Sequence, residues 1–525
     1  MPHFPQEREI IRLQVRNRLA EIEASIYRDR QPITGWETVI TGECRDVEQM
    51  PQGGWTPFEI VTKSGERTGA LKRPIASHYR QRVLSTQWGW FDRSQWFRAM
   101  VTVPESMKGW PVVALLEPGA EALCYVNGVP TQGLDPNRSE VILTSCAEGG
   151  ETYEIAIEAS ATPNAFDDDP IRLFKTPFLA VKDTLAWDFF WDIKVGQELI
   201  EALPEGTEKH RLADLVERSV KMVNLNSVST IDRYHAELKT ARDAYLDGRK
   251  QFEKSIDSGR VINVGHSHID TAWLWAIRET RKKSSRTFST VLKYMDQYPH
   301  YTYTQGQPQL YAWIEEHYPE IFEGIKKRIA DGRWEANGAS WVEQDSNVAG
   351  AEAIVRQYLY GRRYFQNVLG SEADVAWLPD AFGFPVTMPQ ILAKAGVRAF
   401  GTTKINWSQY NRFPYHTFRW RGLDGTEIFA FMPPGHYNGI VNASNARMIW
   451  NAYLQKDISG EILNTYGHGD GGGGPTQEML ENLSRLEEFS ILPKMEVGNI
   501  GPHVDEAVSG VDWEQFPVYN EELLP

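Results

Sequence analysis

Short apolar runs of strand length alternate with longer helical stretches throughout the second half of the chain. Four such strand-then-helix units follow one another from Arg260 onwards. Their strand runs are VINVG (261–265), YTYTQG (301–306), WEANGASWV (334–342) and DVAWLPD (374–380), and RAFGTTKI (398–405) follows the fourth helix. Because strands that alternate with helices pair in parallel, this pattern predicts a parallel α/β sheet, closed into a (β/α) barrel.

The first half of the chain has a different pattern. Residues 6–27 carry apolar side chains at helical spacing, and residues 208–257 are again helical in pattern. Between them, from Trp96, short alternating runs are separated by turn sequences such as VNGV and AEGGE, as in an antiparallel β-sandwich. We therefore predict a multidomain α/β plus all-β protein. Residues 1–257 would form an N-terminal helix, a β-sandwich and a helical linker, and residues 258–525 a catalytic α/β barrel domain.

The composition excludes several classes of protein. The 525 residues include 55 Lys+Arg and 70 Asp+Glu, a net charge of −15, which leaves no cationic surplus for nucleic-acid binding. No run approaches the ~20 apolar residues of a membrane-spanning helix, and the N-terminus has no secretory signal pattern. The three cysteines are too few for a disulfide framework. We predict a cytoplasmic protein without membrane or nucleic-acid partners, and the sequence leaves formation of a homo-oligomer open.

Polar side chains suited to chemistry follow the predicted strands. In chain order they are His266, His268, Asp270, Glu343, Asp345, Asp380, Lys404 and, in the glycine-rich GHGDGGGG, Asp470. In parallel α/β folds the reactive groups lie at the carboxyl ends of the strands. His268 and Asp270 are two residues apart on an extended segment, so their side chains project to the same side. Such a pair can offer nitrogen and oxygen donors to one Zn²⁺ ion.

Each of these residues also has an ordinary structural interpretation. Asp270 can be a helix N-cap, Asp380 an Asx-turn residue and Asp470 a turn residue. The two histidines can be buried side chains with satisfied hydrogen bonds, and the two acids of the third unit can be solvated loop residues. The recurrence of such groups at successive strand ends favours a functional site, because caps alone would scatter over both ends of the units.

Several long segments resemble glycoside hydrolase family 38, the retaining alpha-mannosidases. They are HSHIDTAWLW, EANGASWVEQD, WLPDAFGFPVTMPQIL, TTKINWSQYNRFPYHTFRWRGLDGTEI and YGHGDGGGGPT, and the match extends over residues 258–505. The upstream EPGAEALCYVNGVPTQGLD resembles the β-sandwich that precedes the catalytic domain in the cytosolic and vacuolar branch. The resemblance implies hydrolysis of terminal α-D-mannosyl residues of oligosaccharides through a zinc-assisted covalent mannosyl-enzyme intermediate.

The resemblance also implies roles for individual residues. His268, Asp270 and Asp380 match the ligands of the family's catalytic Zn²⁺. The family binds one such ion per site, and Co²⁺ is an alternative. Asp380 also matches the nucleophile, and Asp470 lies where the family has its acid/base carboxylate. The positions that line the sugar site are matched by Trp273, Asp345 and Lys404. His266 matches a position beside the metal, able to orient a ligand rather than bind the ion.

The family pattern extends beyond the segments matched here. It completes the zinc site with a second histidine, in a His-Asp segment well downstream, and continues with helical and β domains. His436, His468 and His503 do not lie in that context. The resemblance therefore implies the N-terminal portion of an alpha-mannosidase, without the family's fourth metal ligand.

Two other functions fit parts of the sequence. His-x-His after a first barrel strand also suits a metal-dependent amidohydrolase, but that chemistry needs further histidines where Asp345, Asp380 and Asp470 stand. The 18 Trp, 21 Tyr and 22 Phe also suit an inactive truncated fragment that acts as a carbohydrate-binding module. The retained carboxylates favour the hydrolase.

Overall fold

The computed structural model describes residues 4–43, 49–60, 85–89, 93–161, 171–252, 259–408, 410–489 and 491–525. The chain divides into two compact units, Met1–Gln251 with Leu274–Lys282, and Phe252–Trp273 with Lys283–Pro525. The predicted domain boundary after residue 257 falls within residues 253–258, outside the described part of the chain. Across the described ranges, no helix combines the length and the apolar character needed to cross a bilayer.

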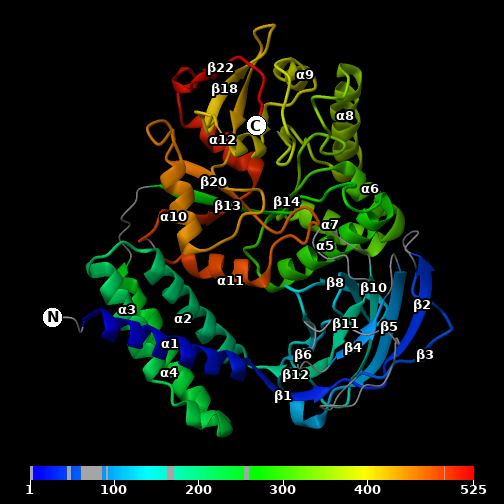
Figure 1. The fold of residues 1–525 in the computed structure, drawn as a ribbon, viewed down its shortest axis with the longest axis vertical. Coiled ribbons are helices and arrows are strands. Elements are labelled where there is room, and N and C mark those ends of the chain that lie inside the picture. Colours follow the sequence, from blue (N-terminus) through cyan, green and yellow to red (C-terminus); the bar gives the residue numbers. More distant parts are fainter. Residues whose placement is uncertain are drawn as a thin grey trace. The chain divides into compact units, whose positions relative to one another are not determined.

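The described residues of the first unit form a group of helices and an antiparallel sandwich. The helices are α1 (Phe4–Ile26), α2 (Thr184–Ala202), α3 (Thr207–Lys221) and α4 (Ile231–Arg249), and Figure 1 shows them packed side by side. The strands are β1 (Tyr27–Pro32), β2 (Glu37–Glu43), β3 (Thr56–Pro57), β4 (Ser85–Trp88), β5 (Arg93–Thr102), β6 (Val112–Leu115), β7 (Ala122–Val126), β8 (Val129–Leu134), β9 (Glu140–Thr144), β10 (Thr152–Ser160), β11 (Arg172–Lys175) and β12 (Phe178–Lys182). They pair in the orders β1-β12-β6-β9, β3-β2-β5-β10-β7-β8 and β11-β4.

The sandwich core follows from the alternation seen in the sequence. Successive residues of a strand point to opposite faces, so every second residue of β5, namely Phe97, Ala99 and Val101, enters one buried cluster. Leu179 and Val181 of the opposing sheet enter the same cluster. The predicted β-sandwich and the helices predicted at 6–27 and from residue 208 are confirmed.

The second unit carries the strand–helix alternation. Its strands are β13 (Arg260–His266), β14 (Tyr303–Gln305), β15 (Trp334–Ala336), β16 (Val375–Trp377), β17 (Ala399–Gly401), β18 (Thr417–Arg421), β19 (Glu427–Phe431), β20 (Glu461–Tyr466), β21 (Lys494–Val497) and β22 (Val518–Tyr519). Its helices are α5 (Ile277–Gln297, whose first residues belong to the other unit), α6 (Pro308–His317), α7 (Pro319–Ala330), α8 (Ala351–Tyr364), α9 (Met388–Lys394), α10 (Ala443–Ala452), α11 (Gln477–Leu486) and α12 (Ile500–Ser509).

These strands form two sheets. The first has the order β15-β14-β13-β20 with β21 also beside β13, and all its pairings are parallel. The second has the order β16-β17-β19-β18-β22, in which β18 and β19 pair as an antiparallel hairpin. A closed barrel requires each strand to be hydrogen-bonded along its length to both neighbouring strands. Between these two sheets the structure has isolated β-bridges instead, such as that between Gly338 and Ala376. The parallel α/β character is confirmed, but a closed (β/α) barrel is not.

A buried histidine beside β18 makes the stability of this unit depend on pH. The Nδ1 atom of His416 accepts a hydrogen bond from the backbone N–H of Leu454 at 3.1 Å, and burial, with the charge of Lys456, lowers the pKa of His416 to about 4. In the unfolded chain the pKa of this histidine is ~6.5, so between ~6.5 and the lower folded-state value the unfolded chain binds a proton and the folded chain does not. Stability is therefore expected to fall by up to about 3 kcal/mol as pH drops from ~6.5 to ~4.

A His416→Gln variant isolates this contribution. Its free energy of unfolding, measured by urea titration at pH 7.5 and pH 5, is expected to change less on acidification than that of the unmodified chain. Equal pH dependence in the two proteins would contradict the assignment.

Candidate metal and catalytic site

The carboxyl ends of several strands supply the residues of the site. His268 and Asp270 follow β13, and Asp470 follows β20, which is parallel to β13. Asp380 follows β16, and Lys404 begins a 3₁₀ turn (Lys404–Trp407) after β17. Parallel strands present their carboxyl ends at the same edge, so groups distant in sequence come together there.

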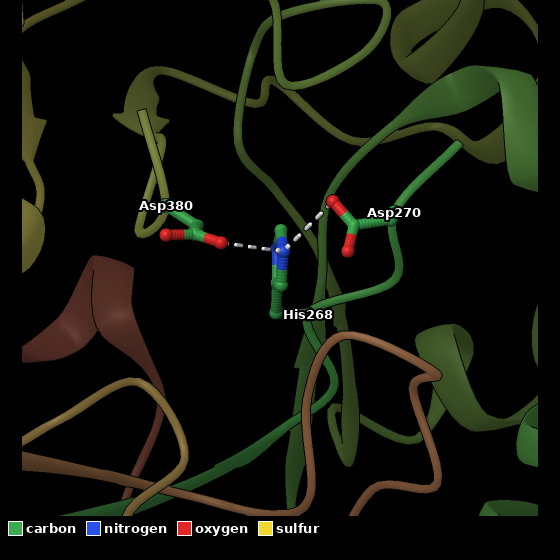
Figure 2. Close-up of side chains that lie close together, drawn as sticks. All are labelled: His268, Asp270 and Asp380. Carbon is green, nitrogen blue, oxygen red and sulfur yellow. Dashed lines mark ion pairs between the residues drawn. The ribbon is translucent and has the colours of Figure 1, made fainter. Parts of the chain in front are cut away.

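His268, Asp270 and Asp380 converge on one point. Their donor atoms all lie within 4.8 Å of one another. His268 Nε2 is 3.4 Å from an Asp270 carboxylate oxygen and 3.3 Å from an Asp380 oxygen, and Figure 2 shows the imidazole between the two carboxylates. The structure thus brings together the three residues predicted as metal ligands.

The donor set fits a divalent transition metal. His268 Nε2 is buried and faces the oxygens of Asp270 and Asp380, at 3.4 and 3.3 Å. Its other ring nitrogen, Nδ1, contacts Glu343 at 3.0 Å, so Nε2 is left either to donate a proton to the two carboxylates or to bind a cation between them. One imidazole nitrogen and two carboxylate oxygens are donors that both Zn²⁺ and Co²⁺ accept.

The charges around His268 show what such a cation would replace. Burial by itself lowers the pKa of His268, but Glu343, Asp270 and Asp380 outweigh it and hold the pKa well above its usual range. The surrounding carboxylates thus favour a positive charge at this point. A proton supplies that charge in the metal-free protein, and a metal ion would have to displace it.

Lys404 contacts the second oxygen of Asp380. Its ammonium pairs with Asp380 and also lies 3.7 Å from the centre of the Trp407 ring and 4.6 Å from that of Phe382. Burial raises the pKa of Asp380, but the hydrogen bonds and charges of His268 and Lys404 outweigh it and lower the pKa below its usual value. Asp380 is therefore held as a carboxylate, the form a nucleophile requires.

Tyr437 interacts with the carboxylates of Asp470 and Asp380. Its hydroxyl donates to an Asp470 oxygen at 2.8 Å. Burial raises the pKa of Tyr437, as do interactions with both Asp470 and Asp380, so the phenol stays protonated. One hydroxyl therefore interacts with the predicted nucleophile and with the predicted acid/base.

The glycine-rich loop is fastened to the segment after β13. Asp470 has a left-handed backbone, with φ of 59°, and its carbonyl accepts a hydrogen bond from the Asp270 N–H at 3.0 Å. Gly472 also has positive φ, and a Cβ there would lie 2.2 Å from the Ile269 side chain. Only glycine allows this approach, which holds Asp470 beside the metal-ligand segment.

Two of the residues matched to the sugar site, Trp273 and Asp345, are exposed. Trp273 lies three residues after Asp270 and is 49% exposed. Asp345 is exposed, and one of its carboxylate oxygens accepts from the backbone N–H groups of Asn347 and Val348 at 2.7 and 2.9 Å, as in an Asx turn. Their roles in sugar binding stay predictions.

His266 contacts the backbone rather than a metal ligand. Its Nε2 donates to the carbonyl of Tyr437 at 2.9 Å. Burial, with the charge of His268, lowers the pKa of His266 to about 4, so the ring is neutral. This hydrogen bond holds the Tyr437 loop, and a role of His266 in orienting a metal ligand stays a prediction.

Sequence reasoning gave no role to three residues around the site. Glu343 has the same signal as the others, a carboxylate after a predicted strand, but the sequence pattern alone favours a solvated loop at this position. Tyr437 lies in a loop after β19, and Gln307 is an uncharged residue before α6, so neither carried a signal in the sequence.

Two family models match the chain. The chain matches the model of the glycosyl hydrolases family 38 N-terminal domain over residues 258–522, and that of the alpha-mannosidase jelly roll domain over residues 56–177. The second match covers most of the sandwich.

Curated relatives match most of the chain. Alpha-mannosidase G of Dictyostelium discoideum is 31% identical over 81% of this chain and 40% of its own length. An alpha-mannosidase of Saccharomyces cerevisiae is 30% identical over 71% of this chain and 36% of its own length. Human alpha-mannosidase 2C1 is 29% identical over 77% of this chain and 40% of its own length. The chain spans about two fifths of the length of these relatives.

Proposed function

Because the chain belongs to glycosyl hydrolase family 38, we propose that it hydrolyses terminal α-D-mannosyl residues of oligosaccharides with retention of anomeric configuration. The surroundings of Asp380 carry the proposal. One of its oxygens faces His268 Nε2 at 3.3 Å, and the other pairs with Lys404. A retaining glycosidase needs an ionised carboxylate as nucleophile and a second carboxyl group as acid/base. Here Asp380 is kept ionised, and the Tyr437 hydroxyl interacts with both Asp380 and the second carboxylate, Asp470.

The first step forms a covalent intermediate on Asp380. A carboxylate oxygen of Asp380 forms a bond to the anomeric carbon of mannose as the glycosidic C–O bond breaks. The electron pair of that bond goes to the leaving oxygen, which takes the proton of the Asp470 carboxyl. Retention requires the two carboxyl groups to lie about 5–5.5 Å apart. The shared Tyr437 hydroxyl supports a short separation.

The second step releases the sugar. Asp470, now a carboxylate, takes a proton from water as the water oxygen bonds to the anomeric carbon. The bond to Asp380 breaks, and its electron pair returns to the carboxylate. Lys404 stabilises the regenerated negative charge through its ion pair with Asp380.

His268, Asp270 and Asp380 would hold the metal ion, Zn²⁺ or Co²⁺. When bound, such an ion supplies Lewis-acid stabilisation of sugar oxygens near the reacting carbon. His268 and Lys404 hold the negative charge on Asp380.

Hydrolysis of a chromogenic α-mannoside by the purified chain tests the proposal. Turnover is expected with Zn²⁺ or Co²⁺, and a chelator is expected to reduce it by at least about tenfold, as loss of a metal-dependent site requires. The matching α-glucoside should be hydrolysed far more slowly. Nuclear magnetic resonance of the first product should show α-mannose before mutarotation.

Each part of the proposal has its own contrary result. Release of β-mannose would replace the retaining mechanism with an inverting one. Full activity after metal removal would exclude the metal from catalysis. Metal-loaded protein that hydrolyses no mannoside would overturn the proposed activity of this chain.

A further inference from the structure

Glu343 contacts the nitrogen of His268 that faces away from the metal ligands. Both carboxylate oxygens of Glu343 lie 3.0 Å from His268 Nδ1. The His268 side chain is 3% exposed and that of Glu343 12%, so little water competes for this contact. Glu343 is 75 residues from His268 in sequence, so the tertiary fold alone brings them together.

Gln307 ties Glu343 to the segment between the two first ligands. Its Nε2 donates to a Glu343 oxygen at 3.2 Å and to the carbonyl of Ile269 at 2.9 Å. Its Oε1 accepts from the backbone N–H of Glu343 at 3.3 Å and from the Thr271 hydroxyl at 3.0 Å. One amide thus fixes Glu343 and the backbone between His268 and Asp270.

We propose that Glu343, held by Gln307, is a positioning residue that orients His268 for metal binding. A carboxylate on Nδ1 keeps a proton there, so Nε2 is the nitrogen left to coordinate a metal ion held with Asp270 and Asp380. It also raises the basicity of the coordinating nitrogen, and such outer partners typically contribute 10- to 100-fold to metal affinity. The inference rests on the proposed metal centre.

The experiment compares metal affinities of the full chain. Zn²⁺ dissociation constants are measured by competition with a chromophoric chelator, and the visible spectrum of the Co²⁺-loaded protein reports ligand geometry. Glu343→Leu, which removes the acceptor, is expected to weaken Zn²⁺ binding 10- to 100-fold and to alter the Co²⁺ spectrum. Glu343→Gln should weaken it less, because an amide oxygen still accepts from Nδ1–H.

Two further variants make the result specific. Glu487→Gln changes a half-buried carboxylate outside the site, which accepts a hydrogen bond from the Val497 backbone N–H, and this variant should bind Zn²⁺ like the unmodified chain. Gln307→Ala retains the Glu343 side chain but removes the hydrogen bonds that hold it, and a several-fold loss of Zn²⁺ affinity is expected. If the Glu343 variants fail to fold, as judged by circular dichroism, the Gln307 variant decides.

The outcomes separate this inference from the metal centre on which it rests. If the unmodified chain binds Zn²⁺, His268→Ala does not, and the Glu343 and Gln307 variants match the unmodified chain, the positioning role is wrong and the metal centre stands. If His268→Ala binds Zn²⁺ as well as the unmodified chain, or neither binds it, the metal centre itself is wrong and the positioning role falls with it.

Discussion

Replacing Asp380 by asparagine is expected to reduce α-mannoside hydrolysis by about 10⁴-fold or more. The amide has nearly the shape of the carboxylate but cannot form the covalent bond to the anomeric carbon, and loss of a catalytic nucleophile has effects of this size. The variant also leaves the Lys404 ammonium without its counter-ion and removes a charged metal donor. Steady-state kinetics with saturating Zn²⁺ measures the loss, because saturation compensates for weaker metal binding.

The matched control is Asp457→Asn, which makes the same chemical change in an exposed turn. It should retain the kinetics of the unmodified chain, and circular dichroism should show both variants folded. An Asp380→Asn protein that is folded, metal-loaded and within tenfold of the unmodified chain would remove Asp380 from the role of nucleophile.

Replacing Asp470 by alanine is expected to lower activity by about 10²- to 10⁴-fold, by an amount that depends on the leaving group. A dinitrophenyl leaving group departs without a proton, whereas the hydroxyl of a second sugar needs one. Formation of the intermediate from a dinitrophenyl mannoside should therefore be affected least, and hydrolysis of a mannobiose most. Pre-steady-state kinetics with the two substrates measures this difference.

Added azide gives an independent check on Asp470. Azide attacks the mannosyl-enzyme without giving up a proton, so it should restore turnover of the dinitrophenyl substrate in the Asp470→Ala variant. Asp457→Ala serves as the control and should not respond. Equal losses for both substrates, without azide rescue, would mean that Asp470 positions Tyr437 through their 2.8 Å hydrogen bond and transfers no proton itself.

Local periodicity made much of the fold readable from the sequence. Alternating runs from Trp96 onwards predicted the sandwich, and helical spacing predicted α1 and the helices after residue 208. The strand–helix units predicted parallel pairing, which the ladders of β13, β14, β15 and β20 confirm. The predicted barrel went further than periodicity allows, since closure depends on how the last strands pair, and β18 and β19 form a hairpin.

Family membership was also readable, because long motifs around His268, Asp380 and Asp470 resemble family 38 and the family model matches the same region. The spacing of His268 and Asp270 on one extended segment indicated a metal pair before any coordinates were considered. The resemblance implied that Asp380 joins that pair, and the structure brings the three residues together.

Only the tertiary structure decided which other groups act on these residues. Glu343 meets His268 across 75 residues, and Tyr437 meets Asp470 from a loop with no regular pattern. Asp345, a carboxylate like Glu343 and only two residues away, bonds to its own loop instead. Sequence periodicity determines which side of a strand or helix a residue occupies. Which distant side chain it meets depends on loop paths and packing, and those depend on the whole chain.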